Sequence, residues 1–138
     1  MTGIELFHRL RDLELPPGDY AVFGSGPLAA HGIIDDPGDL DVLCRGAAWA
    51  AVRQAGALRQ LPDYGVQVVD IDSGLLTFGT TWGIGSFDVA ALIDTAEIID
   101  GLPFVRLEHV VAYKRVRGSE KDRAHLAACA ARGICVTT

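Results

Sequence analysis

Cysteine, methionine and aromatic residues are scarce in this chain of 138 residues, which has three cysteines, one methionine and 7% aromatic residues. Cys44, Cys129 and Cys135 form no C-x-x-C pair. Their odd number and apolar surroundings argue against a disulfide framework or a zinc site. We therefore expect buried, reduced thiols.

Long apolar runs are also missing, since none approaches the roughly 18 residues that a membrane span needs. The N-terminal stretch "MTGIELFHRLRDLEL" carries acids and lacks the apolar core of a signal peptide. These absences predict a protein without membrane contact and a cytoplasmic location. A hydrophobic fraction of 49% over 138 residues suits one globular domain over residues 1–138.

Net charge is −6, which argues against a protein that coats nucleic acid through general charge attraction. The charge is, however, unevenly distributed. Residues 104–138 carry seven basic and three acidic side chains, so the preceding 103 residues sum to −10. An acidic part that faces a basic part would suit a metal–triphosphate, with acids on the metal and bases on the phosphates. A basic tail that is simply a solvated helix face is the alternative.

Apolar periodicity and turn residues predict a mixed α/β fold with helices packed on a mixed sheet. Expected helices cover residues 3–14, 27–32, 47–58, 107–117 and 120–132. Expected strands cover residues 20–23, 40–44, 65–71, 75–81 and 87–93, and "EIIDGLPFVRL" suggests a hairpin or loop.

The stretch "FGSGPLAA" follows an apolar strand and matches the dinucleotide-binding pattern G-x-G-x-x-A letter by letter. In that fold a single acid ends the second strand, about 20 residues beyond the glycines. Here two acids, Asp39 and Asp41, begin the second strand instead. The dinucleotide interpretation is therefore disfavoured.

Strand alternation places the Asp39 and Asp41 side chains on one face, with Leu40 and Val42 on the other. Two like charges about 7 Å apart repel unless something neutralises them, and Mg²⁺ prefers carboxylate oxygens together with triphosphate oxygens. Asp88, inside the apolar run "SFDVAALI", is the favoured third acid, and Asp70 and Asp72 are rival candidates.

Together these residues resemble the DNA polymerase β-like nucleotidyltransferase superfamily, over about residues 20–93. That family has an apolar strand, then Gly-Ser, then an acid-x-acid strand and a third acid on a later strand. The resemblance assigns nucleotide binding to Gly24 and Ser25, and Mg²⁺ or Mn²⁺ binding and catalysis to Asp39, Asp41 and Asp88.

"YKRVRGSEKDRAHL" resembles the Lys-then-Lys-Asp ending of small bacterial nucleotidyltransferases, including those of toxin–antitoxin and abortive-infection systems. The resemblance implies that Lys114 reaches the phosphates and that Asp122 orients it or a neighbour. Helical spacing places both on inward stripes. Simpler interpretations stay open: Ser25 and Asp122 as helix caps, Asp39 as a turn cap, and Lys114 extending from a helix end.

These features predict a Mg²⁺-dependent enzyme that moves a nucleoside monophosphate from a nucleoside triphosphate, such as ATP, to a hydroxyl. Its acceptor would be a protein, an RNA end or a small molecule. Lack of room for a separate acceptor domain predicts a protein partner or a homodimer. The alternative is a catalytically silent, antitoxin-like binding protein on the same fold.

Overall fold

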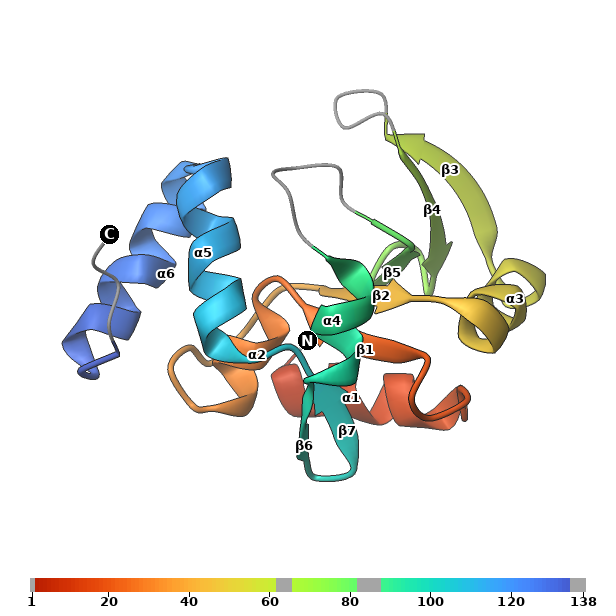
Figure 1. Ribbon diagram of the computed structural model, residues 1–138, viewed down its shortest axis with the longest axis horizontal. Helices are drawn as coiled ribbons and strands as arrows, with labels where there is room; N and C mark the ends of the chain where they lie inside the picture. Colours follow the sequence, from red (N-terminus) through yellow and green to blue (C-terminus); the bar gives the residue numbers. More distant parts are fainter. Residues whose placement is uncertain (1, 62–65, 82–87, 135–138) are drawn as a thin grey trace.

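The computed structural model describes residues 2–61, 66–81 and 88–134, which form a mixed α/β fold (Figure 1). The helices in this part of the chain are α1 (Gly3–Asp12), α2 (Gly26–Ala30), α3 (Gly46–Ala55), α4 (Val89–Asp94), α5 (Leu107–Arg117) and α6 (Glu120–Ala131). The strands are β1 (Tyr20–Phe23), β2 (Leu40–Cys44), β3 (Ala57–Leu61), β4 (Val66–Ile71), β5 (Leu76–Gly79), β6 (Glu97–Ile99) and β7 (Leu102–Phe104). The predicted fold class is therefore confirmed.

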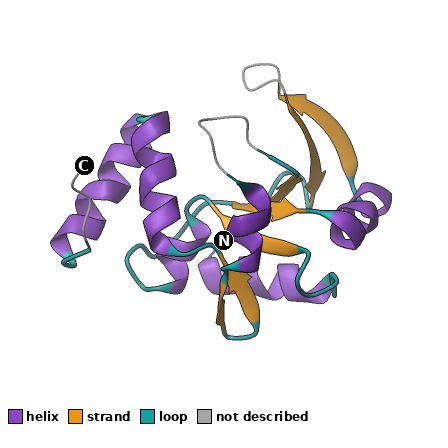
Figure 2. Cartoon of the chain, in the orientation of Figure 1, coloured by secondary structure: helices purple, strands orange, loops and turns teal. Residues whose placement is uncertain are grey.

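All of these strands belong to one sheet of order β3-β4-β5-β2-β1-β7-β6. β2 lies near its centre, antiparallel to β1 and parallel to β5. Helices α5 and α6 lie side by side at one end of the molecule, and the β3–β4 hairpin lies at the other (Figures 1 and 2).

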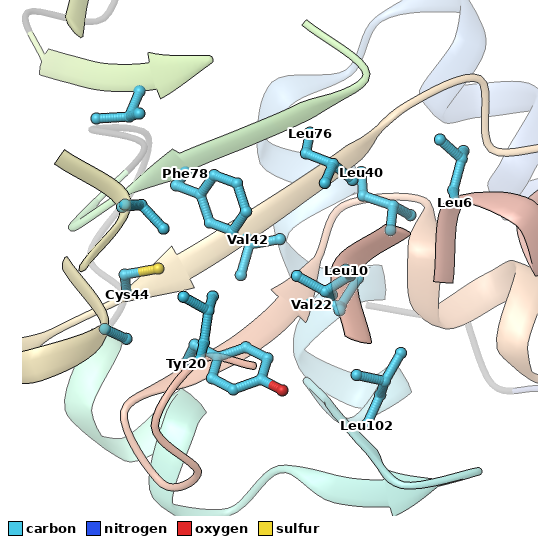
Figure 3. Packing of buried hydrophobic residues seen from close by; sticks show 14 of the residues in the cluster. Leu6, Leu10, Tyr20, Val22, Leu40, Val42, Cys44, Leu76, Phe78 and Leu102 are labelled. Atoms are coloured by element: carbon cyan, nitrogen blue, oxygen red, sulfur yellow. The ribbon is translucent and has the colours of Figure 1, made fainter. Parts of the chain in front are cut away.

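Alternating strand residues separate two hydrophobic clusters, one on each face of the sheet. On the first face Val22 and Val42 pack with Leu6 and Leu10 of α1 (Figure 3). On the second face Phe23 and the neighbouring strand residues pack with α4, α5 and α6. The second face therefore carries the C-terminal helices over its β1 and β2 part.

Most predicted elements are confirmed within one or two residues, but the helix expected over residues 47–58 ends at Ala55. Gly56 is extended there, and a side chain on it would lie 2.5 Å from the backbone oxygen of Asp70 in β4. This close approach of two backbones ends the helix and starts β3, a strand that the sequence pattern did not indicate.

A second expectation, a strand over residues 87–93, is wrong because residues 89–94 form helix α4. Residues 82–87 lie outside the described part of the chain. Asp88 is the N-cap of α4, and its Oδ1 accepts a hydrogen bond from Ala91 N at 3.2 Å. Leu92 and Ile93 are buried against the second face, a helical arrangement that the run "VAALI" allows as readily as a strand.

Two smaller expectations can also be compared with the structure. Cys44 and Cys129 are buried free thiols, as predicted, while Cys135 lies outside the described residues. None of the described helices is long and apolar enough to cross a bilayer.

Candidate functional site

Asp41 lies in β2 and Asp39 directly precedes this strand. Leu40 and Val42 belong to the first hydrophobic cluster, whereas Leu43 belongs to the second. The alternation therefore directs Asp41 away from Leu40 and Val42, as the spacing predicted, and this face is the one that α4, α5 and α6 cover. Asp39 is exposed and Asp41 is half-buried.

Gly24 lies directly against the Asp41 carboxylate, in the turn that follows β1. Its φ is +63°, and a β-carbon at this position would lie 3.1 Å from Asp41 Oδ2. Glycine is thus favoured both by the left-handed backbone and by the close carboxylate. Gly26, by contrast, provides packing space, because its β-carbon would lie 2.4 Å from Val22 Cγ1.

Ser25 occupies the N-cap position of α2, but its hydroxyl makes no capping hydrogen bond. The helix-cap interpretation of this side chain is therefore wrong. Lys114 Nζ donates a hydrogen bond to Ser25 Oγ at 3.2 Å, and His125 Nδ1 lies 3.3 Å from the same oxygen. Ser25 is buried where the β1–α2 turn meets both C-terminal helices.

Lys114 and Asp122 form a fully buried ion pair between α5 and α6, with 3.3 Å between Nζ and Oδ1. Arg117 donates two further hydrogen bonds of 2.7 Å to the Asp122 carboxylate. Ser119 donates to the same carboxylate in a capping box at the start of α6. Asp122 is therefore both a helix cap and the partner of the lysine.

Burial, charge and hydrogen bonding shift the pKa values of both members of this buried pair. Burial lowers the pKa of Lys114, against the attraction of Asp122. Burial acts to raise the pKa of Asp122, but hydrogen bonds from Arg117 and Ser119 hold it well below its ordinary value. Asp122 is thus the negatively charged member of the pair at neutral pH. The Lys114 ammonium is buried and bonded to Ser25 Oγ, so it would act on a ligand through the Ser25 hydroxyl.

Asp39 and Asp41 lack close cationic partners of this kind among the described residues. Within residues 2–61, 66–81 and 88–134, neither carboxylate forms an ion pair within 4 Å. Burial raises the pKa of Asp39, and burial together with the Asp39 charge raises the pKa of Asp41 to about 6. The two acids are therefore under-neutralised, which is the condition that a bound cation would relieve.

Basic side chains of α5 and α6 face this acidic pair at longer range. The charges of Arg117 and Lys121 act to lower the pKa of both Asp39 and Asp41. Lys121 Nζ also donates to the backbone oxygen of Pro37, in the loop before β2, at 3.5 Å. Basic side chains of the C-terminal helices thus lie near the acidic pair.

Of the other acids considered from the sequence, Asp70 lies on the same sheet face as Asp41 but two strands away, because Thr77 of β5 is in register with both. Asp88 is exposed at the start of α4. Asp70 is hydrogen-bonded by Thr77 and paired with Arg59, and Asp72 is paired with Arg9. In the described part of the chain, no three His, Cys, Asp or Glu side chains form a group that could hold a metal ion. The assignment of Asp88 as a third metal ligand stays a prediction.

Two site residues were missed by sequence reasoning. They are His125 of α6 and Arg117 of α5. His125 follows Asp122 by three residues, so both lie on one face of α6. That spacing could have identified His125 once Asp122 was considered a site residue.

No protein-family model, no curated protein and no solved structure matches this chain. The case for function therefore rests on the residues and their geometry.

Proposed function

We propose that this chain is a Mg²⁺- or Mn²⁺-dependent nucleotidyltransferase. It would transfer a nucleoside monophosphate from a nucleoside triphosphate to a hydroxyl of a protein, RNA or small-molecule acceptor. One observation carries the proposal: the under-neutralised Asp41 lies against Gly24 of the Gly24-Ser25 turn, and the charges of Arg117 and Lys121 from α5 and α6 act on both Asp39 and Asp41.

The donor set fits a magnesium ion that also binds phosphate. Mg²⁺ is commonly held by one or two carboxylates and completed by water and substrate phosphate oxygens. Asp39 and Asp41 would supply those two carboxylates. When bound, the metal would neutralise charge on the triphosphate and on the pyrophosphate leaving group.

The remaining residues would bind and orient the triphosphate. Gly24 leaves the Asp41 carboxylate uncovered by a side chain. Arg117 and Lys121 would attract the phosphates from the opposite side, and Ser25 would contribute its hydroxyl, held by Lys114. Fixed positive groups aimed at developing negative charge are a large source of rate in phosphoryl chemistry.

A silent, antitoxin-like binding protein is the second candidate. It is favoured by the absence of a third carboxylate beside Asp39 and Asp41 among the described residues. Such a protein would bind a metal–triphosphate through the same residues without turnover.

Turnover separates these candidates. Purified protein is incubated with Mg²⁺ or Mn²⁺ and each nucleoside triphosphate labelled at the α-phosphorus, with RNA, small hydroxyl compounds or cell extract as acceptors. The proposal predicts pyrophosphate release and a labelled acceptor, both lost in Asp41→Asn and kept in Asp35→Asn, an exposed control acid. Triphosphate binding without turnover would favour the silent protein. No metal-dependent binding at all would refute both.

A further inference from the structure

The family resemblance assigns no role to His125. Its imidazole is half-buried on α6, and Nδ1 lies 3.3 Å from Ser25 Oγ. The site itself therefore contains a titratable group in contact with the hydroxyl proposed to bind phosphate.

The direction of this hydrogen bond follows from the donors around Ser25. A serine hydroxyl has one proton to donate and two lone pairs. Lys114, an ammonium with no lone pair, can only donate to Oγ. If His125 also donated, the buried hydroxyl proton would have no acceptor among the described side chains. Buried polar groups are normally paired, so we assign the Ser25 proton to an unprotonated Nδ1.

In this arrangement the only proton of Ser25 is directed to His125 and away from a ligand. A phosphate oxygen needs that proton, because it can only accept hydrogen bonds. If Nδ1 gains a proton, it becomes a donor and bonds to the second lone pair of Oγ. The Ser25 proton is then free to turn toward a phosphate, while Lys114 keeps its own bond.

Charges around His125 keep it neutral before a ligand arrives. Burial, together with the charges of Lys114, Lys121 and Arg117, lowers the pKa of His125 to about 4 against the attraction of Asp122. These groups come from α5 and from α6 itself. A polyphosphate bound beside the same cations would bring negative charge to the imidazole and favour its protonated form.

We propose that His125 is a positioning residue that takes up one proton as the triphosphate binds and so releases the Ser25 hydroxyl to the ligand. The inference rests on the proposed function, since it names what the same site does when phosphate enters. The resulting imidazolium adds a positive charge next to the phosphates. No bond is made or broken other than the transfer of a solvent proton to Nδ1.

Calorimetry can count this proton. Binding of Mg²⁺ with a triphosphate whose α–β bridging oxygen is replaced by methylene is measured in two buffers of different ionisation enthalpy. At about pH 5.5, above the pKa of free His125, wild type should take up roughly half a proton or more beyond His125→Asn. Proton release from Asp41 on metal binding is common to both proteins and cancels in the comparison. His8→Asn, which removes an exposed histidine, should match wild type.

A second measurement does not depend on a variant. The imidazole resonances of the unmodified protein are titrated with and without the same ligand. The midpoint of His125 should rise by about 1.5 units or more with ligand, which matches an uptake of roughly half a proton at about pH 5.5, and that of His8 should stay unchanged. Equal proton counts in wild type and His125→Asn, or an unmoved midpoint, would overturn the role of His125 and leave the proposed function intact. No ligand binding at all would overturn both.

Discussion

The ammonium of Lys114 donates a hydrogen bond to Ser25 Oγ across 3.2 Å, although 89 residues separate the two in the chain. This contact joins the turn after β1 to helix α5. Asp122 of α6 completes the arrangement through its buried ion pair with Lys114. The phosphate-binding turn proposed from the sequence is therefore built on the C-terminal helices, and changes in those helices should affect it.

Asp41→Asn should stabilise the ligand-free protein at pH 7. Folding raises the pKa of Asp41 from 3.8 to about 6, so the folded state binds more protons than the unfolded state between these values. Stability therefore falls as pH rises through this interval, and the asparagine avoids that loss. We expect a gain of about 1–3 kcal/mol at pH 7 that disappears below about pH 4.

Urea unfolding over a range of pH, without metal, checks this expectation, with Asp35→Asn as the control. Added Mg²⁺ and triphosphate should then stabilise wild type but not Asp41→Asn. An Asp41→Asn protein that is less stable than wild type at pH 7 would show that the carboxylate is already compensated.

Substitutions in the Lys114–Asp122 pair should have unequal costs. Asp122→Asn leaves a buried ammonium without its counter-charge and should lose about 3–5 kcal/mol. Lys114→Met should lose less, about 1 kcal/mol, because Asp122 keeps Arg117 and Ser119. The double variant should be more stable than the sum of the two losses predicts, by about 1–3 kcal/mol. Equal, additive losses in denaturant unfolding would contradict the coupling.

Gly24→Ala and Gly32→Ala form a matched pair. Both glycines have positive φ, +63° and +74°, so each alanine should cost about 1–2 kcal/mol of backbone strain. Only Gly24 has the Asp41 carboxylate within reach of a β-carbon, while nothing lies within 4 Å at Gly32. Metal–triphosphate affinity should therefore fall about tenfold in Gly24→Ala alone. A similar fall in both variants, measured by calorimetry, would assign the effect to global destabilisation.

Asp88 can be tested by separating its cap from any metal role. Serine still caps a helix, whereas alanine does not, so Asp88→Ala should lose about 0.5–2 kcal/mol and Asp88→Ser much less. A site built on Asp39 and Asp41 predicts that Asp88→Ser keeps its turnover within a few-fold. Should Asp88→Ser instead lose about a hundredfold in rate at unchanged melting temperature, Asp88 would be the third metal ligand.

Local pattern located most of the elements because apolar spacing and turn residues act over a few neighbouring positions. It also placed Asp41 on one strand face and Lys114 and Asp122 on inward helix stripes. It failed at residues 89–94, where a short apolar run fits either a strand or a helix and the Asp88 cap decides between them. It missed β3 because the strand depends on Gly56 lying against a distant backbone.

Spacing along the chain thus selected the acid pair and the inward lysine, and the family resemblance joined them with the Gly-Ser turn into one proposed site. The packing of the C-terminal helices on the sheet then determines which of these residues contact one another. Ser25, Lys114 and His125 touch because α5 and α6 cover the same face of the sheet that carries Asp41. No local pattern reports that contact, since hydrogen bonds and charge effects depend on distance in space and not on separation in sequence.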